Sequence, residues 1–340
     1  MKLKISFVVV VLFFIISMGH ASDGHRAEYR IATTEWAGWS PLDVAEALGF
    51  WEDEGLKVTL VHYHGGPVLI DVIRSGKVDL GCNMVGDVVG MHNQSPSMVI
   101  LAEIDWSHGG DMLIQKKGFD LAGHKGGPVG IHYDSPAIWY FMDKFLKKKG
   151  LGFLDFRIVE LPPQDLVAQF VAGRMPFIQH YEPFAGRAIR QGNGEVVATS
   201  ADFPGIIPEC MYGLASRVSR IPDRDIESII RGWIRAAQWS NDPKNWDQYA
   251  RILSTRTLQG TGPHTDAQLK GYFKAIRIHS TEILKQRNRP GGGLENHLSE
   301  LWNFMAKSGK INHWKTPLDI LDTRHLARVL SEDKPLKALK

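Results

Sequence analysis

Residues 29–63 read YRIATTEWAGWSPLDVAEALGFWEDEGLKVTLVHY, and this stretch decides the fold. It opens with a short β-prone run over 29–33, followed by a polar aromatic loop. Ser40 is expected to be the N-cap of a helix with Pro41 at its first position, and Gly49 marks the end of that helix. A second strand is expected over 58–61. The pattern predicts a βαβ unit and hence a parallel sheet.

The loop between strand and helix holds Trp36, Gly38 and Trp39. It follows the carboxyl end of a strand, which is where open α/β sheets bind their ligands. One interpretation is that both indoles only fill core beneath the loop. The flexible glycine between them favours the second interpretation, a flat aromatic platform for a ligand.

The middle of the chain repeats this arrangement. A strand is expected over 129–131, and Ser135-Pro136 then opens a helix as Ser40-Pro41 did. A later strand over 177–179 leads directly into Tyr181 and Glu182. The segment 111–114 is expected to cross into a second lobe and 210–215 to return from it. Two such crossings make a hinge.

The loop Trp36-Ala37-Gly38-Trp39-Ser40-Pro41-Leu42, with Gly49-Phe50-Trp51 and Gly55-Leu56-Lys57-Val58 after it, carries a family resemblance. The chain resembles the substrate-binding proteins of ABC importers, in the nitrate/sulfonate/taurine-type group that includes thiamine-precursor binders. It departs from the usual pattern at Met175-Pro176 and at Tyr181, where relatives have Val-Asp and Trp.

The resemblance implies an α/β, two-lobed type II periplasmic binding protein. Each lobe would be a mixed, mostly parallel sheet flanked by helices, and an all-helical C-terminal extension would pack on lobe 1. It also implies the transmembrane subunits of an ABC permease as partners, a monomeric state and no cofactor.

Four segments are expected along the chain. Residues 1–21 have two lysines, an apolar run and small residues at the end, which is the pattern of a secretory signal peptide. Residues 27–112 would form the first part of lobe 1, 113–208 lobe 2, and 209–340 the return to lobe 1 with the C-terminal helices. No cysteine follows the expected cleavage site, so a periplasmic protein without a lipid anchor is expected.

Composition excludes several classes of function. The formal net charge is +3 over 340 residues, without a basic block interleaved with aromatics, so nucleic acid is not an expected partner. Cys82 and Cys210, the two cysteines, are expected to be separately buried thiols. His62 and His64 would share one face of a strand, but no third ligand follows at a readable spacing, and no metal site is predicted.

The predicted ligand site draws on loops that follow strands in both lobes. Its residues are Trp36, Trp39, Asp87, Asp105 and Trp106 from the first lobe, and Ser135, Tyr181 and Glu182 from the second. The alternative for Glu182 is that it only caps its own helix ahead of Pro183.

These loops are acidic. They contribute Glu35, Asp87, Asp105, Asp111, Asp134 and Glu182, and neither Arg nor Lys. Like-charge repulsion would exclude an anion, so the expected solute is neutral or cationic and contains an aromatic nitrogen, such as a pyrimidine-type vitamin precursor or an aromatic amine. A sulfonate, taurine or nitrate binder remains an alternative, because the two Ser-Pro helix starts would suit an oxyanion.

Two further functions stay open at this point. The same lobe pair serves as a ligand-sensing subunit for membrane receptors. Relatives that synthesise the thiamine pyrimidine share the fold, but they carry a cysteine-rich iron-binding motif that is missing here. The sequence also lacks a nucleophile elbow, a zinc-binding helix and a phosphate loop, so no enzymatic activity is predicted.

Overall fold

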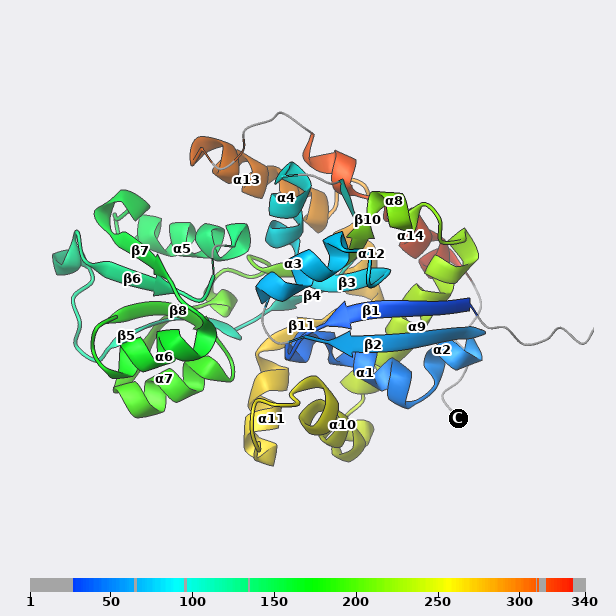
Figure 1. The fold of residues 1–340 in the computed structure, drawn as a ribbon, viewed down its shortest axis with the longest axis horizontal. Coiled ribbons are helices and arrows are strands. Elements are labelled where there is room, and N and C mark those ends of the chain that lie inside the picture. Colours follow the sequence, from blue (N-terminus) through cyan, green and yellow to red (C-terminus); the bar gives the residue numbers. More distant parts are fainter. Residues whose placement is uncertain are drawn as a thin grey trace, which may run out of the picture.

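The computed structural model describes residues 27–63, 66–94, 97–133, 135–309, 311 and 316–332. The expected signal peptide, His64 and Asp134 lie outside the described residues. Two sheets, each with its own flanking helices, form the two lobes that Figure 1 shows side by side. Among the described helices, none is long and apolar enough to cross a membrane.

The first sheet has six strands in the order β11-β4-β10-β3-β1-β2. β1 pairs in parallel with β2 and β3, whereas β10 lies antiparallel between β3 and β4. The strands are β1 (Ala27–Thr33), β2 (Leu56–His62), β3 (Leu80–Met84), β4 (Met98–Ser107), β10 (Pro208–Leu214) and β11 (Ile276–Ile278).

The second sheet has five strands in the order β7-β6-β8-β5-β9. β6 is parallel to β7 and β8, and β5 runs antiparallel between β8 and β9. The strands are β5 (Asp111–Lys116), β6 (Pro128–Ile131), β7 (Arg157–Glu160), β8 (Phe177–Tyr181) and β9 (Gly194–Thr199). Strand pairing puts Asp111 in the second sheet and Pro208 in the first. The lobe boundaries expected at 112/113 and 208/209 stay predictions.

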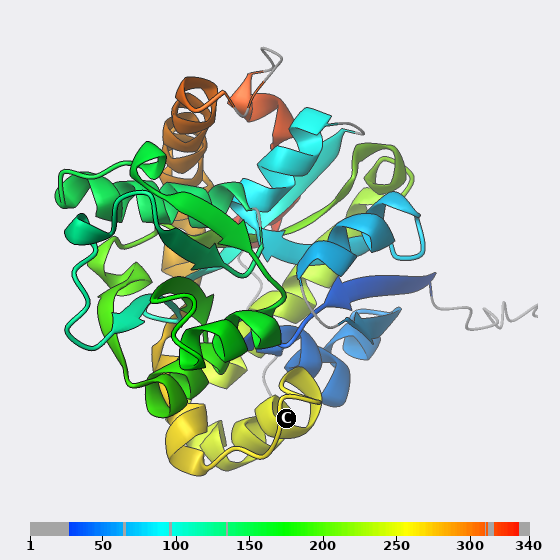
Figure 2. The ribbon, with the colours of Figure 1, turned by 60° about the vertical axis from the view of Figure 1, so that its left-hand side comes forward.

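Helices cover the faces of both sheets (Figures 1 and 2). Those of the first lobe are α1 (Ser40–Ala47), α2 (Phe50–Asp53), α3 (Gly66–Arg74) and α4 (Val85–Gln94), and those of the second are α5 (Pro136–Lys148), α6 (Pro163–Val171) and α7 (Phe184–Gly192). After β10 come α8 (Ala215–Val218), α9 (Asp223–Asn241), α10 (Trp246–Ile252), α11 (Asp266–Lys274), α12 (Thr281–Asn288), α13 (Gly293–Lys307) and α14 (Arg324–Ser331). Short turns are η1 (Ala37–Trp39), η2 (Ala122–His124), η3 (Phe153–Asp155), η4 (Ser200–Asp202), η5 (Pro243–Asn245), the π-helical η6 (Leu253–Thr257) and η7 (Pro317–Ile320).

The two Ser-Pro starts differ in the structure. Ser135 is the N-cap of α5, and its hydroxyl accepts from the backbone N–H groups of Ala137 and Ile138. Ser40 is not an N-cap, because η1 runs into α1 and Ser40 is already helical. Its hydroxyl instead shares a 2.7 Å hydrogen bond with the hydroxyl of Tyr249 on α10. The Ser40 prediction was therefore wrong in its local detail.

The C-terminal extension is not all-helical, which corrects the sequence prediction. β11 adds an antiparallel strand to the outer edge of β4, where it covers an edge that would otherwise be open. Nor does the extension contact lobe 1 alone. α13 packs against α5 of the second lobe, where the Tyr140 hydroxyl donates to Glu300 at 2.6 Å.

The two cysteines are free and buried, as predicted. They lie on the neighbouring strands β3 and β10, where Cys210 pairs with Asn83 and Cys82 with Met211. Directly opposed residues point to the same face of a sheet, and successive residues alternate between faces. Cys82 and Cys210 therefore point to opposite faces, which explains why they do not pair.

A buried ion-pair network fastens α12 to β4. The Glu103 carboxylate, fully buried, accepts from Arg287 at 2.7 and 2.9 Å and lies 2.9 Å from His279 Nε2. Asn288 also bonds both backbone groups of Glu103. Burial alone would raise the pKa of Glu103, but His279 and Arg287 outweigh it and hold the pKa below its usual range.

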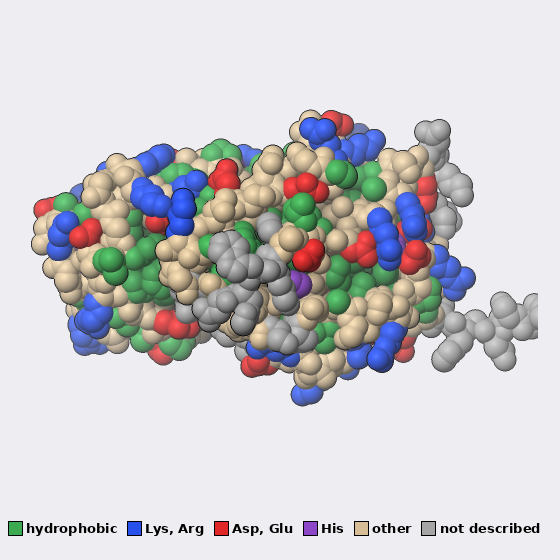
Figure 3. Space-filling model, turned by 90° about the horizontal axis from the view of Figure 1, so that it is seen from above, with side chains coloured by type: hydrophobic (Ala, Val, Ile, Leu, Met, Phe, Trp, Pro, Cys, Tyr) green, Lys and Arg blue, Asp and Glu red, His purple; other side chains and the backbone are tan. Residues whose placement is uncertain are grey.

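On the face in Figure 3, acidic and basic side chains are scattered over both lobes, without a continuous basic stripe among the described residues. This agrees with the near-neutral net charge.

Replacing Arg287 tests the network. Arg287→Met leaves the Glu103 charge buried with fewer partners, so it should cost about 3–5 kcal/mol of unfolding free energy in a urea titration. The control is Lys57→Met, which removes the exposed Glu28–Lys57 pair at 3.0 Å and should change stability by under about 1 kcal/mol. Equal effects of the two variants would contradict the network's role.

Candidate ligand-binding site

Side chains from both lobes meet where the chain crosses between the sheets. We call this region the interlobe site. Its residues are Trp36, Trp39, Asp87, Asp105, Asp111, Tyr181 and Glu209. Two segments cross here, one between β4 and β5 and one between β9 and β10. Every one of these side chains except Tyr181 is buried.

The aromatic loop of the first lobe forms the turn η1. Trp36 and Trp39 are both buried, so they are partly core, as the first interpretation of the loop required. Trp36 also reaches the second lobe, where its ring meets Tyr181 edge-on at 6.3 Å and 73°. Neither indole N–H has a hydrogen-bond partner among the described residues. Both are donors left available for a ligand or a neighbouring acid.

Asp87 links the lobes. It lies in the first turn of α4, where a negative charge is favoured by the helix dipole. Its two oxygens accept from the Tyr133 and Ser135 hydroxyls of the second lobe. Ser135 in turn caps α5, so the Asp87 carboxylate sits at the N-terminus of α5. Gly86 allows this approach, because a Cβ there would lie 2.6 Å from the Ala137 nitrogen.

Asp111 begins a chain of hydrogen bonds in the second lobe. Gln179 donates to Asp111 at 3.1 Å, and its amide oxygen lies 2.7 Å from His132 Nδ1. This geometry assigns the Nδ1–H tautomer to His132. Burial raises the pKa of Asp111 to about 6, against hydrogen bonds from Ser107 and Gln179. Burial also lowers the pKa of His132 to about 3, so its imidazole is neutral.

Asp105 and Glu209 lie opposite each other on β4 and β10. Burial raises the pKa of both carboxyl groups well above the usual range. For Glu209, the charges of Asp105 and Asp111 raise it further. The indole N–H groups of Trp36 and Trp39 lie near enough to Asp105 and Glu209 to oppose these shifts, yet neither pair reaches hydrogen-bond geometry.

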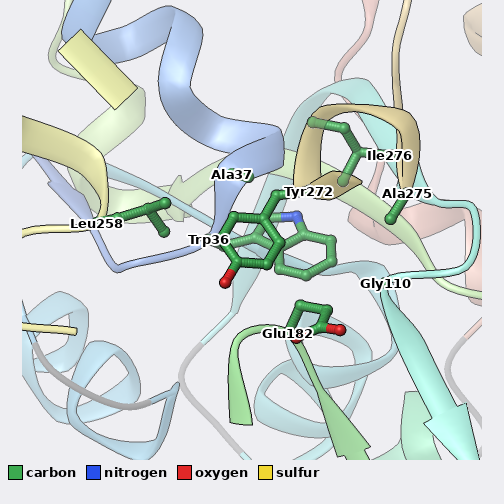
Figure 4. Close-up of a pocket in the computed structure, with 8 residues that line it drawn as sticks. All are labelled: Trp36, Ala37, Gly110, Glu182, Leu258, Tyr272, Ala275 and Ile276. Carbon is green, nitrogen blue, oxygen red and sulfur yellow. The ribbon is translucent and has the colours of Figure 1, made fainter. Parts of the chain in front are cut away.

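A hollow opens beside the interlobe site (Figure 4). It is narrow, with a cavity volume of about 10 Å³, and its lining joins residues of both lobes and of the C-terminal extension. Trp36 and Tyr272 overlap at the centre of the view, and Glu182 faces them from the second lobe. The lining residues are Trp36, Ala37, Gly110, Glu182, Leu258, Tyr272, Ala275 and Ile276.

The structure brings most of the predicted site residues together, with two exceptions. Glu182 lines the hollow, but its carboxylate also accepts from the Gly186 N–H at 3.2 Å, which is the capping role expected as its alternative. Trp106 faces the other way. Its ring meets His279 at 4.8 Å and the Arg287 guanidinium at 5.4 Å, so it leaves the candidate site.

Sequence reasoning missed Glu209, Gln179 and His132 as parts of the site. Glu209 was missed because the return strand was expected to begin one residue later, at Cys210. An acidic residue at the start of a fully buried strand was the available signal. His132 and Gln179 were placed in the correct loop and strand, but nothing in the sequence showed their pairing.

No metal centre is evident among the described residues, where three or more His, Cys, Asp or Glu side chains nowhere converge. His62 instead lies 3.0 Å from Asp43 Oδ1. Hydrogen bonding to Asp43 raises the pKa of His62 above its usual value, against its partial burial.

Comparison with known sequences gives a family and distant relatives. The model of the NMT1-like family matches residues 22–254. The nitrate import ATP-binding protein NrtC of Synechocystis is 23% identical over 245 residues, which cover 65% of this chain but only 36% of that protein. A Brucella abortus protein that bears the provisional name of a binding protein is 24% identical over 309 residues, or 88% of each chain.

Solved structures share the fold. The periplasmic nitrate-binding protein NrtA from Synechocystis has a TM-score of 0.72 at 15% identity, over 90% of this chain and 88% of NrtA. The alkanesulfonate-binding protein SsuA from Xanthomonas axonopodis, bound to MOPS, has a TM-score of 0.69 at 15% identity, over 87% of this chain and 98% of SsuA. These likenesses confirm the predicted two-lobed α/β fold.

Gly38 tests how tightly the site is built. A Cβ at this position would collide with the Asp105 carboxylate and the Trp36 indole. Gly38→Ala should therefore cost about 1–3 kcal/mol of stability and shift the tryptophan fluorescence. The control is Gly271→Ala on α11, where a Cβ meets nothing within 4 Å and should stabilise the helix by up to about 1 kcal/mol. An unchanged Gly38→Ala protein would contradict the packing described.

Asp111 should make the stability depend on pH. Its pKa of about 6 in the fold exceeds its ordinary 3.8, so the stabilising protonated form is lost as pH rises from about 4 to 6. Asp111→Asn should therefore gain about 2 kcal/mol relative to wild type between about pH 4.5 and about pH 7.5.

Urea titrations at the two pH values measure this gain. Asp247→Asn is the control, because Asp247 is exposed on α10 and its removal takes no charge out of the interior. A gain for Asp111→Asn that is the same at both pH values would contradict the raised pKa.

Proposed function

The chain belongs to the NMT1-like family, and from that premise and the interlobe site we propose that it is the solute-binding component of an ABC import system. It acts in the periplasm as a monomer, closes on one small solute and delivers it to the transmembrane subunits of the permease. The relatives named above support this proposal, because one solved structure is a periplasmic nitrate-binding protein and another is an alkanesulfonate-binding protein.

The solute is neutral or cationic and carries an aromatic nitrogen group. This solute class follows from one observation: the interlobe site contains buried carboxyl groups that no Lys, Arg or His of the described residues neutralises. Asp105, Asp111 and Glu209 have no ion-pair partner among the described residues. Bringing an oxyanion beside them would add repulsion in a site with little water to screen it. A nitrogen donor over the Trp36 ring meets both the charge and the aromatic surface.

The alternative that the solute is a sulfonate, taurine or nitrate depended mainly on free helix N-termini. Helix N-termini are the usual backbone sites for oxyanions, and α5 offers one. That end of α5 is already occupied, since Ser135 takes its first N–H groups and Asp87 binds Ser135. The protein thus supplies its own carboxylate at the position where an oxyanion would bind.

A thermal-shift screen tests the solute class. We expect 4-aminopyrimidine and benzamidine to raise the melting temperature, and taurine, ethanesulfonate and nitrate to leave it unchanged. Small-angle scattering should show a smaller radius of gyration when the protein is saturated, as hinge closure requires. Stabilisation by the anions alone would overturn the assigned class.

Calorimetry on matched variants locates the site. Trp36→Phe keeps an aromatic ring but loses the indole N–H and area, and should weaken binding by roughly threefold to tenfold. Trp106→Phe removes the same atoms from the opposite face of β4 and should bind like wild type. If Trp106→Phe weakened binding and Trp36→Phe did not, the ligand site would lie elsewhere.

Transport itself is tested in the cell of origin. A strain lacking the gene should lose uptake of the bound solute and regain it with wild type but not with a non-binding variant. Normal uptake together with a lost transcriptional response to the solute would favour the sensor function instead.

A further inference from the structure

Asp105 and Glu209 form a pair that no other part of the fold explains. They are direct neighbours across the antiparallel β4 and β10 strands, and their exposed fractions are 0% and 3%. Both oxygens of Asp105 and Oε2 of Glu209 have no hydrogen-bond partner among the described residues. Buried carboxyl oxygens are normally satisfied, so an unsatisfied set of this kind points to an absent partner.

The groups around the pair do not supply that partner. No Lys, Arg or His of the described chain lies within ion-pair distance of either carboxyl. The charges that reach them are negative: Glu103 from β4 acts on Asp105, and Asp87 from α4 and Asp111 from β5 act on Glu209. The neutral groups near them are the Cys82 and Cys210 thiols, the indoles of Trp36 and Trp39, and the Tyr249 hydroxyl on α10.

Two adjacent carboxylates in such a place cannot both stay ionised. When two carboxyls share a buried site, at least one of them stays protonated, because ionising both would leave two desolvated anions side by side. The raised pKa of both groups agrees with this geometry. The unliganded protein therefore holds at least one proton on the pair.

We infer that Asp105 and Glu209 are the solute-recognising pair, and that a planar cationic group with at least two N–H donors, such as an amidinium or guanidinium, displaces a proton from the pair on binding. This inference rests on the proposed function and narrows its solute class. The displaced proton leaves to bulk solvent, and the two carboxylates then accept from the N–H groups. Planar nitrogen cations make paired hydrogen bonds with carboxylates, which satisfies the oxygens that are otherwise unpartnered.

The consequence is proton-linked binding. Each bound cation should release about one proton, so affinity should rise about tenfold per pH unit while the pair is protonated. Phenylguanidine is the probe, because a guanidinium keeps its own charge throughout the neutral range. Phenylurea has nearly the same shape without the charge, and serves as the matched ligand.

Calorimetry in two buffers with different ionisation enthalpies measures the released protons. We expect wild type to bind phenylguanidine more tightly than phenylurea, with proton release and with affinity rising with pH. Glu209→Gln and Asp105→Asn are isosteric, and each should weaken phenylguanidine binding at least tenfold and flatten its pH dependence, with a smaller effect on phenylurea, which loses a hydrogen-bond acceptor but no charge partner. Glu195→Gln on β9 is the control and should behave like wild type.

An infrared measurement on the ligand-free protein keeps the test independent of variant folding. At neutral pH, wild type should show the C=O stretch of a protonated carboxylic acid, and saturating phenylguanidine should remove it. The absence of that band, binding without proton release, or failure of phenylguanidine to bind wild type would each overturn the inference. If the protein binds phenylguanidine with proton release but the cell's uptake does not depend on it, only the transport proposal is contradicted.

Discussion

Glu103 and Asp105 lie on the same strand, β4, and are both fully buried, yet their surroundings are opposite. Arg287 and His279 hold the pKa of Glu103 below its usual range, whereas burial raises the pKa of Asp105, which lies opposite Glu209. A β-bulge in the pairing with β10 separates them and turns them to different faces. One face of β4 thus fastens the C-terminal extension, and the other holds carboxyls that have no ion-pair partner among the described residues.

The C-terminal extension contacts both lobes and the first crossing segment. β11 lies against β4, and the Ala275 carbonyl just before it accepts from the His108 and Gly110 N–H groups in the first crossing. α13 reaches α5 through Tyr140 and Glu300. Any opening movement must therefore either carry α13 along or break its contact with α5. The crossing segments are thus held by backbone bonds to the extension as well as by their own strands.

The sequence predicted the fold well because the deciding features are local. A strand, a loop, a Ser-Pro pair and a helix appear twice, and each lobe is built on that repeat. Trp36, Trp39, Asp87 and Tyr181 followed from one rule, that ligands bind beyond the carboxyl ends of parallel strands. Inferring the rest needed the pairing of strands distant in sequence, which no local pattern shows.

Trp106, which was wrongly placed in the site, and Glu209, which was missed, illustrate this limit. Asp105 and Trp106 were both assigned to one loop, but β4 continues to Ser107, and adjacent strand residues point to opposite faces. Only Asp105 then faces the site. Glu209 was overlooked for the converse reason. β10 is antiparallel to its neighbours, so its first residues, rather than its last, lie at the edge of the sheet where β3 and β4 end.

A crystal structure of the protein purified under native conditions with its solute retained tests the central claim most directly. We predict a nitrogen-containing ring against Trp36, with its N–H groups donating to Asp105 and Glu209. An oxyanion at the N-terminus of α5, with Asp87 moved away from Ser135, would contradict it.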